Sequence, residues 1–221
     1  MAKRFKFYSS DHLLKDFPDA QYYMIYGERS NGKTYDSLLR GLRNYAKTGE
    51  QFAYLRRWGE DIRTKNLSNL FSGHIENGVL KTLFADKWNQ IYYRSGKFFL
   101  EKREDDGTVT RDENPVGYAF DLNGMEHYKS TSFPRVTLII FDEFLSRNGY
   151  LPNEFTLFQN SLSTIIRHRD NVKIFMLGNT VNQRSRDPGV NLLNRYLAIG
   201  RVGNLVGSLV SRSLDRKVLI G

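Results

Sequence analysis

The sequence predicts an α/β fold in which a mostly parallel sheet is flanked by helices. Three apolar segments, residues 21–26, 136–141 and 172–179, have the length of strands. The hydrophobicity of the second is continuous rather than alternating, which is typical of a strand buried on both faces of a parallel sheet. An amphipathic segment at residues 35–46 predicts a helix after the first strand. The 221 residues, 40% of them hydrophobic, suffice for one such domain.

A glycine-rich segment joins the first strand to this helix. Residues 27–34, GERSNGKT, match the phosphate-loop pattern G-x-x-x-x-G-K-[ST] at every fixed position. The glycines let backbone N–H groups surround an anion, and the helix N-terminus adds a favourable dipole. The loop residues expected to bind the nucleotide are Gly27, Arg29, Ser30, Asn31, Gly32, Lys33 and Thr34. The alternative is an ordinary glycine-rich turn, and the strand–loop–helix context argues against it.

The last two residues of this loop have separate roles in ATP binding. We expect Lys33 to neutralise the β- and γ-phosphates of ATP, and the Thr34 hydroxyl to bind Mg²⁺. The expected cofactors are therefore ATP and Mg²⁺.

Two acids follow the apolar segment at residues 136–141. We expect Asp142 to share the Mg²⁺ with Thr34, and Glu143 to orient and deprotonate the attacking water. Two acids in series after a buried strand form a Walker B pattern, whereas the alternative is a strand that ends in a helix cap. Together the two motifs predict a P-loop NTPase of the additional-strand catalytic-glutamate (ASCE) type.

Shorter elements surround these motifs. Ser10 and Asp11 precede a short helix expected at residues 12–15, and further elements are a strand at 51–57 and a helix at 61–70. From about residue 73 to 123, aromatic segments separated by Asn-Gly, Ser-Gly and Asp-Gly pairs predict a β-meander inserted into the α/β core. Its strands are expected at residues 78–80, 91–94, 97–101 and 117–120.

The segment after the second motif predicts a helix at residues 153–169 and a buried strand at 172–179. That strand ends in Asn179, which we expect to sense the γ-phosphate or to help place the water, with a cap or turn residue as the alternative. From residue 180 onward the apolar periodicity ends, and a short strand or hairpin is expected around residues 196–210. We therefore predict an ATPase domain at residues 1–183 and a basic linker or tail at 184–221, which leads to a further C-terminal domain.

The composition bounds the partners and excludes some chemistry. The 33 Lys and Arg residues against 24 Asp and Glu residues give a net charge of +9, which favours a polyanionic partner such as nucleic acid. Arg56 and Arg57 are candidates for DNA contact by charge. Because the chain has no cysteine, disulfides and thiolate metal sites are excluded. No apolar run approaches the length of a membrane span, so we expect a soluble protein without a membrane partner.

The order of the motifs is similar to that in one family. GERSNGKT, GEQFAYLRR, FPRVTLIIFDEF, LPNEF, IIRHRDNVKIF and LGN resemble the DNA packaging (encapsidation) ATPases of small protein-primed tailed phages, the phi 29 group. The resemblance implies a homo-oligomeric ring, pentameric in the family, that pumps double-stranded DNA into an empty capsid. It implies the phage portal, or connector, as a partner and packaging RNA as a further candidate. The expected location is the host cell cytoplasm, transiently at the portal vertex of the procapsid.

The resemblance also assigns roles to three basic residues. Arg29 matches an arginine that packaging ATPases place inside the phosphate loop. Arg167 matches the arginine finger that the family offers to the γ-phosphate of the neighbouring subunit. Lys129 falls where the family has a lysine before the Walker B strand, suggested to act across the same interface. The expected catalytic residues are thus Glu143, Arg167, Asn179 and Lys129.

Two other functions remain open from the sequence. One is a P-loop DNA translocase or helicase-like ATPase that does not package DNA. The other is a non-catalytic module that binds DNA or the portal, against which the complete set of Lys33, Thr34, Asp142 and Glu143 argues. A GTPase is disfavoured, because no N-K-x-D motif follows the strand at residues 172–179.

Overall fold

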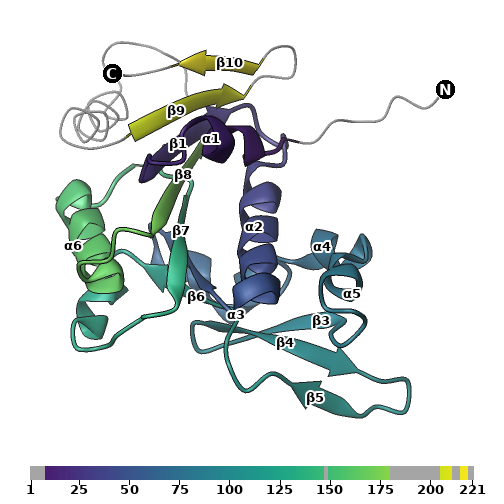
Figure 1. The fold of residues 1–221 in the computed structure, drawn as a ribbon. Helices are drawn as coiled ribbons and strands as arrows, with labels where there is room; N and C mark the ends of the chain where they lie inside the picture. The colour runs from purple at the N-terminus through teal and green to yellow at the C-terminus, as the bar shows by residue number, and fades with distance from the viewer. Residues whose placement is uncertain (1–7, 147–148, 180–204, 211–214, 219–221) are drawn as a thin grey trace.

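One large sheet organises the chain (Figure 1). The structure is a computed structural model that describes residues 8–146 and 149–179, and the backbone of strands at 205–210 and 215–218. The strand order is β10-β9-β1-β8-β7-β2-β6-β4-β3, and β5 pairs with β4. The bounds of the central strands are β9 Leu205–Val210, β1 Tyr22–Gly27, β8 Lys173–Asn179, β7 Val136–Asp142, β2 Gln51–Arg56 and β6 Gly117–Asp121.

The central strands run parallel to one another, and the strands at both ends do not. At one end β10 (Asp215–Val218) pairs antiparallel with β9. At the other end, antiparallel pairing joins β6, β4 (Lys97–Arg103), β3 (Gln90–Arg94) and β5 (Val109–Arg111). The fold is therefore α/β, as predicted, but the sheet is mixed: its centre is parallel and its two ends are antiparallel.

Helices cover both faces of this centre (Figure 1). Helix α2 (Lys33–Thr48) lies on one face and α6 (Glu154–Ile166) on the other. The alternation along β2 shows the division, since Phe52 and Tyr54 pack in the cluster that includes α2, and Ala53 and Leu55 pack in the cluster that includes α6. Each cluster is buried, so the parallel strands have two apolar faces, as their continuous hydrophobicity predicts.

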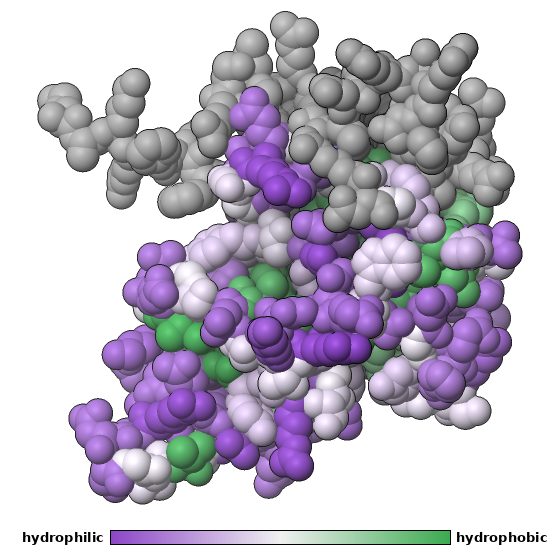
Figure 2. All heavy atoms as spheres, turned by 180° about the vertical axis from the view of Figure 1, so that it is seen from behind, coloured by the Kyte–Doolittle hydropathy of each residue, from purple (hydrophilic) through white to green (hydrophobic). Residues whose placement is uncertain are grey.

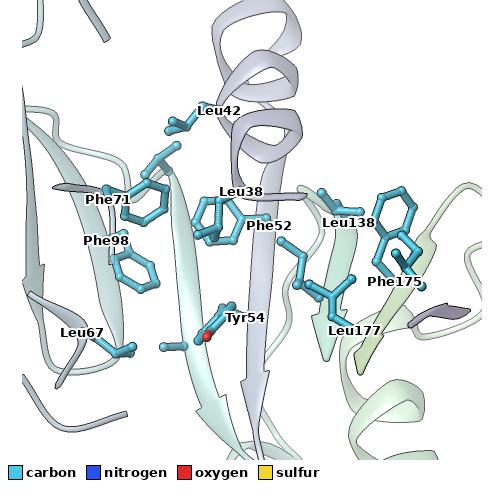
Figure 3. Packing of buried hydrophobic residues seen from close by; sticks show 14 of the residues in the cluster. Leu38, Leu42, Phe52, Tyr54, Leu67, Phe71, Phe98, Leu138, Phe175 and Leu177 are labelled. Carbon is cyan, nitrogen blue, oxygen red and sulfur yellow. The ribbon is translucent and has the colours of Figure 1, made fainter. Parts of the chain in front are cut away.

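The α2 side of the core is aromatic. Figure 3 shows Phe52 and Leu38 at the centre of this cluster, with Phe71 and Phe98 on one side and Phe175 on the other. The ring centroid of Phe52 lies 6.0 Å from that of Phe71 and 5.7 Å from that of Phe98. The aromatic insert therefore packs into the same core as the phosphate-loop helix.

The predicted β-meander at about 73–123 is partly wrong. Its first segment, expected as a strand at 78–80, belongs to helix α5 (Val79–Leu83), which Gly78 precedes with φ of +67°. The physical reason is burial, because Leu80 lies in the core while Val79 and Leu83 pack against it at helical spacing. The other three predicted strands are β3, β4 and β6, and the Ser95-Gly96 turn between β3 and β4 has positive φ at both residues, as a tight hairpin requires.

The remaining helices are short and differ from the predicted bounds. The helix expected at 61–70 is a 3₁₀ turn followed by one α-helical turn. The helix expected at 153–169 ends at Ile166, because Arg167 and His168 adopt left-handed backbone angles. Ser10 does not cap its helix through its side chain, which donates to Asp36 instead. The bounds of the short helices are α1 Asp11–Asp16, η1 Gly59–Ile62, α3 Thr64–Leu67, α4 Ser72–Glu76, α5 Val79–Leu83 and η2 Gly124–Tyr128.

The sheet also extends past residue 183, where a linker was expected to begin. Strand β9 pairs in parallel with β1 over six residues, and β10 follows it in the sheet. The rest of the expected tail at 184–221, and the part of the expected hairpin before residue 205, lie outside the described residues.

Hydrophilic side chains cover most of the described surface seen in Figure 2, with hydrophobic ones gathered in small areas. Within the part of the chain that the structure describes, no helix combines the length and the hydrophobicity needed to cross a membrane.

Candidate functional site

The glycine-rich loop lies at the carboxyl edge of the parallel strands. Strand β1 ends at Gly27, and α2 begins at Lys33. Gly32 has φ of +86°, a left-handed conformation that glycine adopts without steric cost, and Ser30 also has a positive φ of +61°. The loop therefore turns sharply and directs the N-terminus of α2 toward the space beyond β1.

One cavity of about 410 Å³ joins this loop to three of the other predicted site residues, Asp142, Glu143 and Asn179. Its lining comes from the loop, from the end of β7 and from the end of β8, which are neighbouring strands. The lining residues are Arg29, Ser30, Asn31, Gly32, Lys33, Thr34, Tyr35, Asp142, Glu143, Leu177, Gly178 and Asn179. The structure thus brings together the loop, the paired acids and Asn179, as expected from strands that end at one edge.

The Lys33 ammonium lies inside the loop. Its Nζ donates to the carbonyl oxygen of Glu28 at 2.6 Å and to that of Gly27 at 3.4 Å. Burial lowers the pKa of Lys33, while the negative charges of Asp142 and Glu28 act in the opposite direction. A phosphate group in this loop would supply the charge partner that the buried cation favours.

Asp142 is the most enclosed acid of the site. Its carboxylate accepts hydrogen bonds from Tyr54 Oη at 2.8 Å and from the backbone N–H of Glu143 at 3.0 Å. Thr34 Oγ1 lies 3.2 Å and 3.3 Å from its two oxygens. Burial raises the pKa of Asp142, and the nearby charge of Arg56 opposes this effect. A carboxylate beside a hydroxyl is an oxygen donor set of the kind Mg²⁺ prefers, so the residues present fit this ion.

Glu143 adopts a strained backbone conformation. Its φ is +57°, in the left-handed region that costs a non-glycine residue roughly 1–2 kcal/mol. Its side chain is 49% exposed, and its Oε2 lies 3.0 Å from Nη2 of Arg56. Strain of this kind at the end of a strand is common at functional sites.

Arg56, the last residue of β2, and Arg57, which follows it, contact the site because β2 is the neighbour of β7. Arg56 also lies 3.2 Å from Asp61 and 3.7 Å from Asp142. Arg57 is buried and bonds to Glu154 and to the backbone carbonyls of Glu143 and Phe144. Arg57 was a candidate for DNA contact by charge alone, and its enclosed guanidinium argues against that role. The sequence shows two arginines at the carboxyl end of a strand, but it does not show that this strand pairs with the one that ends in Asp142, so their contacts with the acids could not be predicted.

Arg167 and Lys129 lie together in a different place. Arg167 Nη2 donates to the carbonyls of Lys129 at 2.8 Å and of Thr131 at 2.9 Å. Both residues line a second cavity of about 650 Å³. Arg169, two residues on, bonds to the carbonyl of Val136 at the first residue of β7, whereas Asp142 is the last. This cluster therefore lies near the opposite end of β7 from the acids, roughly 20 Å away along the strand.

The fold and site define an α/β protein with a glycine-rich phosphate-loop sequence and paired acids at the carboxyl edge of a mixed sheet. Within this class, the chain belongs to the podovirus DNA encapsidation protein (Gp16) family, whose model matches residues 1–190. The resemblance found in the sequence motifs is thereby confirmed.

Individual relatives support this membership. A DNA packaging protein of Bacillus phage B103 is 30% identical over 161 residues, which are 72% of this chain and 44% of that protein. The chain thus spans less than half the length of this relative. The crystal structure of the N-terminal domain of the DNA packaging ATPase from bacteriophage phi29 matches with a TM-score of 0.63 and 27% identity, covering 85% of this chain and 86% of that one. The phi29 viral genome packaging motor assembly matches with a TM-score of 0.62 and 27% identity, covering 85% of this chain and 51% of that one.

Proposed function

We propose that this chain is the ATP-hydrolysing part of a motor that moves double-stranded DNA into a phage capsid. The observation that carries the proposal is the single cavity lined by Lys33, Thr34, Asp142 and Glu143. These residues supply a phosphate cation, two oxygen ligands for Mg²⁺ and a carboxylate base. Membership of the DNA encapsidation family supports the coupling to DNA.

The strand order supports the ASCE type of P-loop ATPase. Strand β8 lies between β1, which carries the phosphate loop, and β7, which carries the acids. An additional strand between these two is the arrangement for which this type is named. Asn179 at the end of β8 then faces the same cavity as the loop, where an amide can contact the γ-phosphate or the water.

The residues divide the work of hydrolysis. The loop N–H groups and Lys33 bind the phosphates, while Thr34 and Asp142 hold Mg²⁺, which when bound neutralises phosphate charge. Glu143 orients the attacking water and accepts its proton. Because Arg56 bonds to Oε2 of Glu143, Oε1 is the oxygen that can accept the proton while the ion pair stays intact.

We infer that Arg167 and Lys129 act on a neighbouring subunit. They lie roughly 20 Å from the acids of their own chain, too far for direct contact with a nucleotide bound there. A ring in which each cavity is completed by the next subunit explains this separation. From the family, the expected assembly is a pentamer bound to the portal together with packaging RNA. Such a ring acts at the portal vertex in the host cytoplasm.

The test is ATP hydrolysis by the 221-residue chain, measured across protein concentrations with and without double-stranded DNA. An interfacial site predicts a rate that rises faster than linearly with protein concentration and increases with DNA. Lys33→Ala at matched concentrations is the control for contaminating ATPases. A wild-type rate that does not exceed this control at any concentration contradicts the proposal.

A further inference from the structure

Two consecutive arginines hold Glu143 from opposite faces of the sheet. Phe52 and Tyr54 face the α2 side, and Arg56 continues this alternation at the end of β2. Arg57, the next residue, lies on the α6 side, where its guanidinium is over the rings of Phe141 and Tyr150. Arg56 bonds to the Glu143 carboxylate, whereas Arg57 bonds to its backbone. The contact between Arg57 and the Glu143 backbone is not needed to bind a nucleotide, and the Arg57 side chain is the more deeply buried of the two arginines.

The Arg57 guanidinium makes four hydrogen bonds to fixed partners. Its Nε and Nη2 donate to the two carboxylate oxygens of Glu154 at 2.6 Å and 2.8 Å. Its Nη1 donates to the Glu143 carbonyl at 2.9 Å, and Nη2 also donates to the Phe144 carbonyl at 2.7 Å. The side chains of Arg57 and Glu154 are 3% and 1% exposed. A bidentate, buried pair of this kind fixes direction as well as distance.

Glu154 is the first residue of α6. Through Arg57, the ion pair therefore attaches this helix to Glu143 and Phe144, the residues that follow β7. Glu154 also accepts the backbone N–H of Leu151 at 3.0 Å, which fixes the turn that leads into the helix. Along its length the helix packs on β7, where the rings of Phe158 and Phe141 stack at 5.1 Å. Its other end is followed directly by Arg167.

We propose that Arg57 and Glu154 form a positioning pair that makes the direction of Glu143 depend on the place of helix α6. This inference rests on the proposed role of Glu143 as the base. The left-handed φ of Glu143 persists only where surrounding contacts hold it. The Glu143 N–H bond to Asp142 and the Phe144 N–H bond to Leu177 supply two such contacts, and Arg57 adds two more through the carbonyls of Glu143 and Phe144. Because α6 is a rigid rod of 13 residues that joins Glu154 to Arg167, a shift of the helix when Arg167 engages a neighbour reaches Glu143 through this pair.

The test compares two matched substitutions, Glu154→Gln and Glu101→Gln. Glu101 is the control because it is also a buried carboxylate with arginine partners, Arg103 and Arg111, but lies in β4 away from the cavity. We expect Glu154→Gln to lower kcat for ATP by roughly 10²-fold, the effect of a small misplacement of a catalytic group. The KM and the ATP affinity should stay unchanged, because no phosphate contact is lost. Glu101→Gln should leave kcat unchanged at the same folded fraction.

A second variant separates positioning from stability. Arg57→Met combined with Glu154→Leu replaces the buried ion pair by apolar side chains, which commonly preserves or raises stability. We expect this double variant to be folded, with a melting temperature close to that of the wild type, yet as slow as Glu154→Gln. Wild-type kcat in the double variant, or equal losses in Glu154→Gln and Glu101→Gln, overturns the inference and leaves the proposed function intact.

A structural readout covers the remaining case. If the wild-type chain hydrolyses no ATP, the proposed function fails, and the crystal structure of Glu154→Gln decides on the positioning pair. The expected result is a Glu143 that has left the left-handed region. A Glu143 that keeps φ near +57° with both carbonyl contacts of Arg57 intact overturns the inference.

Discussion

Nη2 of Arg56 lies 3.0 Å from Oε2 of Glu143, so the candidate base is paired with a cation of its own chain. The same guanidinium is 3.7 Å from Asp142, and its side chain is only 16% exposed. One arginine therefore lies between the residue proposed to bind Mg²⁺ and the residue proposed to activate water. Removal of Arg56 would therefore take a positive charge away from Asp142 and a hydrogen-bond donor away from Glu143.

Substitution of Arg56 by alanine should make binding of Mg²⁺ and ATP more sensitive to acid. Burial already raises the pKa of Asp142, and the charge of Arg56 opposes that rise. Without Arg56 the pKa of Asp142 rises further, so protonation competes with Mg²⁺ at a higher pH than in the wild type. Titration of ATP binding from about pH 5 to about pH 8, a range that lies above the ordinary carboxyl pKa values of about 4, measures this shift. Arg63→Ala, which removes a 70% exposed arginine, is the control, and identical pH profiles for all three proteins would contradict the prediction.

Glu143→Gln should bind ATP like the wild type but lose steady-state hydrolysis. The amide keeps the shape of the side chain and cannot accept a proton from water, so a loss of roughly 10²- to 10⁴-fold in kcat is expected. Binding of a fluorescent ATP analogue and release of phosphate measure the two steps separately. The exposed Glu60 offers the matched control Glu60→Gln. Full turnover by Glu143→Gln would remove this residue from the site.

Mixtures of two inactive variants should regain activity if Arg167 acts on a neighbouring subunit. Arg167→Ala removes the proposed finger and leaves Glu143 intact, while Glu143→Gln does the reverse. In mixed rings some interfaces combine an intact Glu143 with an intact Arg167, so phosphate release should exceed that of either variant alone. Failure to regain activity at any mixing ratio, under conditions where wild-type rings form, argues that the finger assignment is wrong.

Gly41→Ala should destabilise the protein although alanine favours helix. A Cβ at Gly41, in the middle of α2, would lie 2.7 Å from Cδ1 and 3.0 Å from Cγ of Phe52. The gain of up to 1 kcal/mol in helix propensity is smaller than the roughly 1–3 kcal/mol that overpacking a core costs. Thermal unfolding should show a melting temperature lower by a few degrees. Gly73→Ala is the matched control, because its nearest neighbour, Tyr35, is at an ordinary 3.5 Å, and an unchanged melting temperature for Gly41→Ala would refute the close approach.

The sequence predicted the part of the site that follows from local pattern. Lys33 and Thr34 are placed by the loop itself, and Asp142 and Asn179 each end a buried parallel strand. Parallel strands end at one edge, so these residues could be expected in one cavity before the strand order was known. Their catalytic roles stay predictions.

The contacts that the sequence did not predict depend on which strands are neighbours. Arg56 and Arg57 meet the acids only because β2 pairs with β7, and the partner of Arg57, Glu154, is 97 residues away. The misassigned strand at residues 78–80 has a different cause, because an Asn-Gly pair favours a hairpin locally and burial of Leu80 decides for a helix. In such short segments, tertiary packing overrides the local conformational preference of the residues.

The parallel pairing of β9 with β1 has a consequence for how the chain is made. Tyr22 is opposite Leu205, so the phosphate-loop strand acquires this neighbour only after residue 205 has left the ribosome. Contacts this distant in sequence form slowly, and until then β1 presents an open edge at which another strand can pair. The family model matches only as far as residue 190, so a chain cut at that border would retain the loop and both acids while leaving this edge uncovered. Such a fragment should aggregate more readily than the 221-residue chain, and light scattering of the two at equal concentration measures the difference.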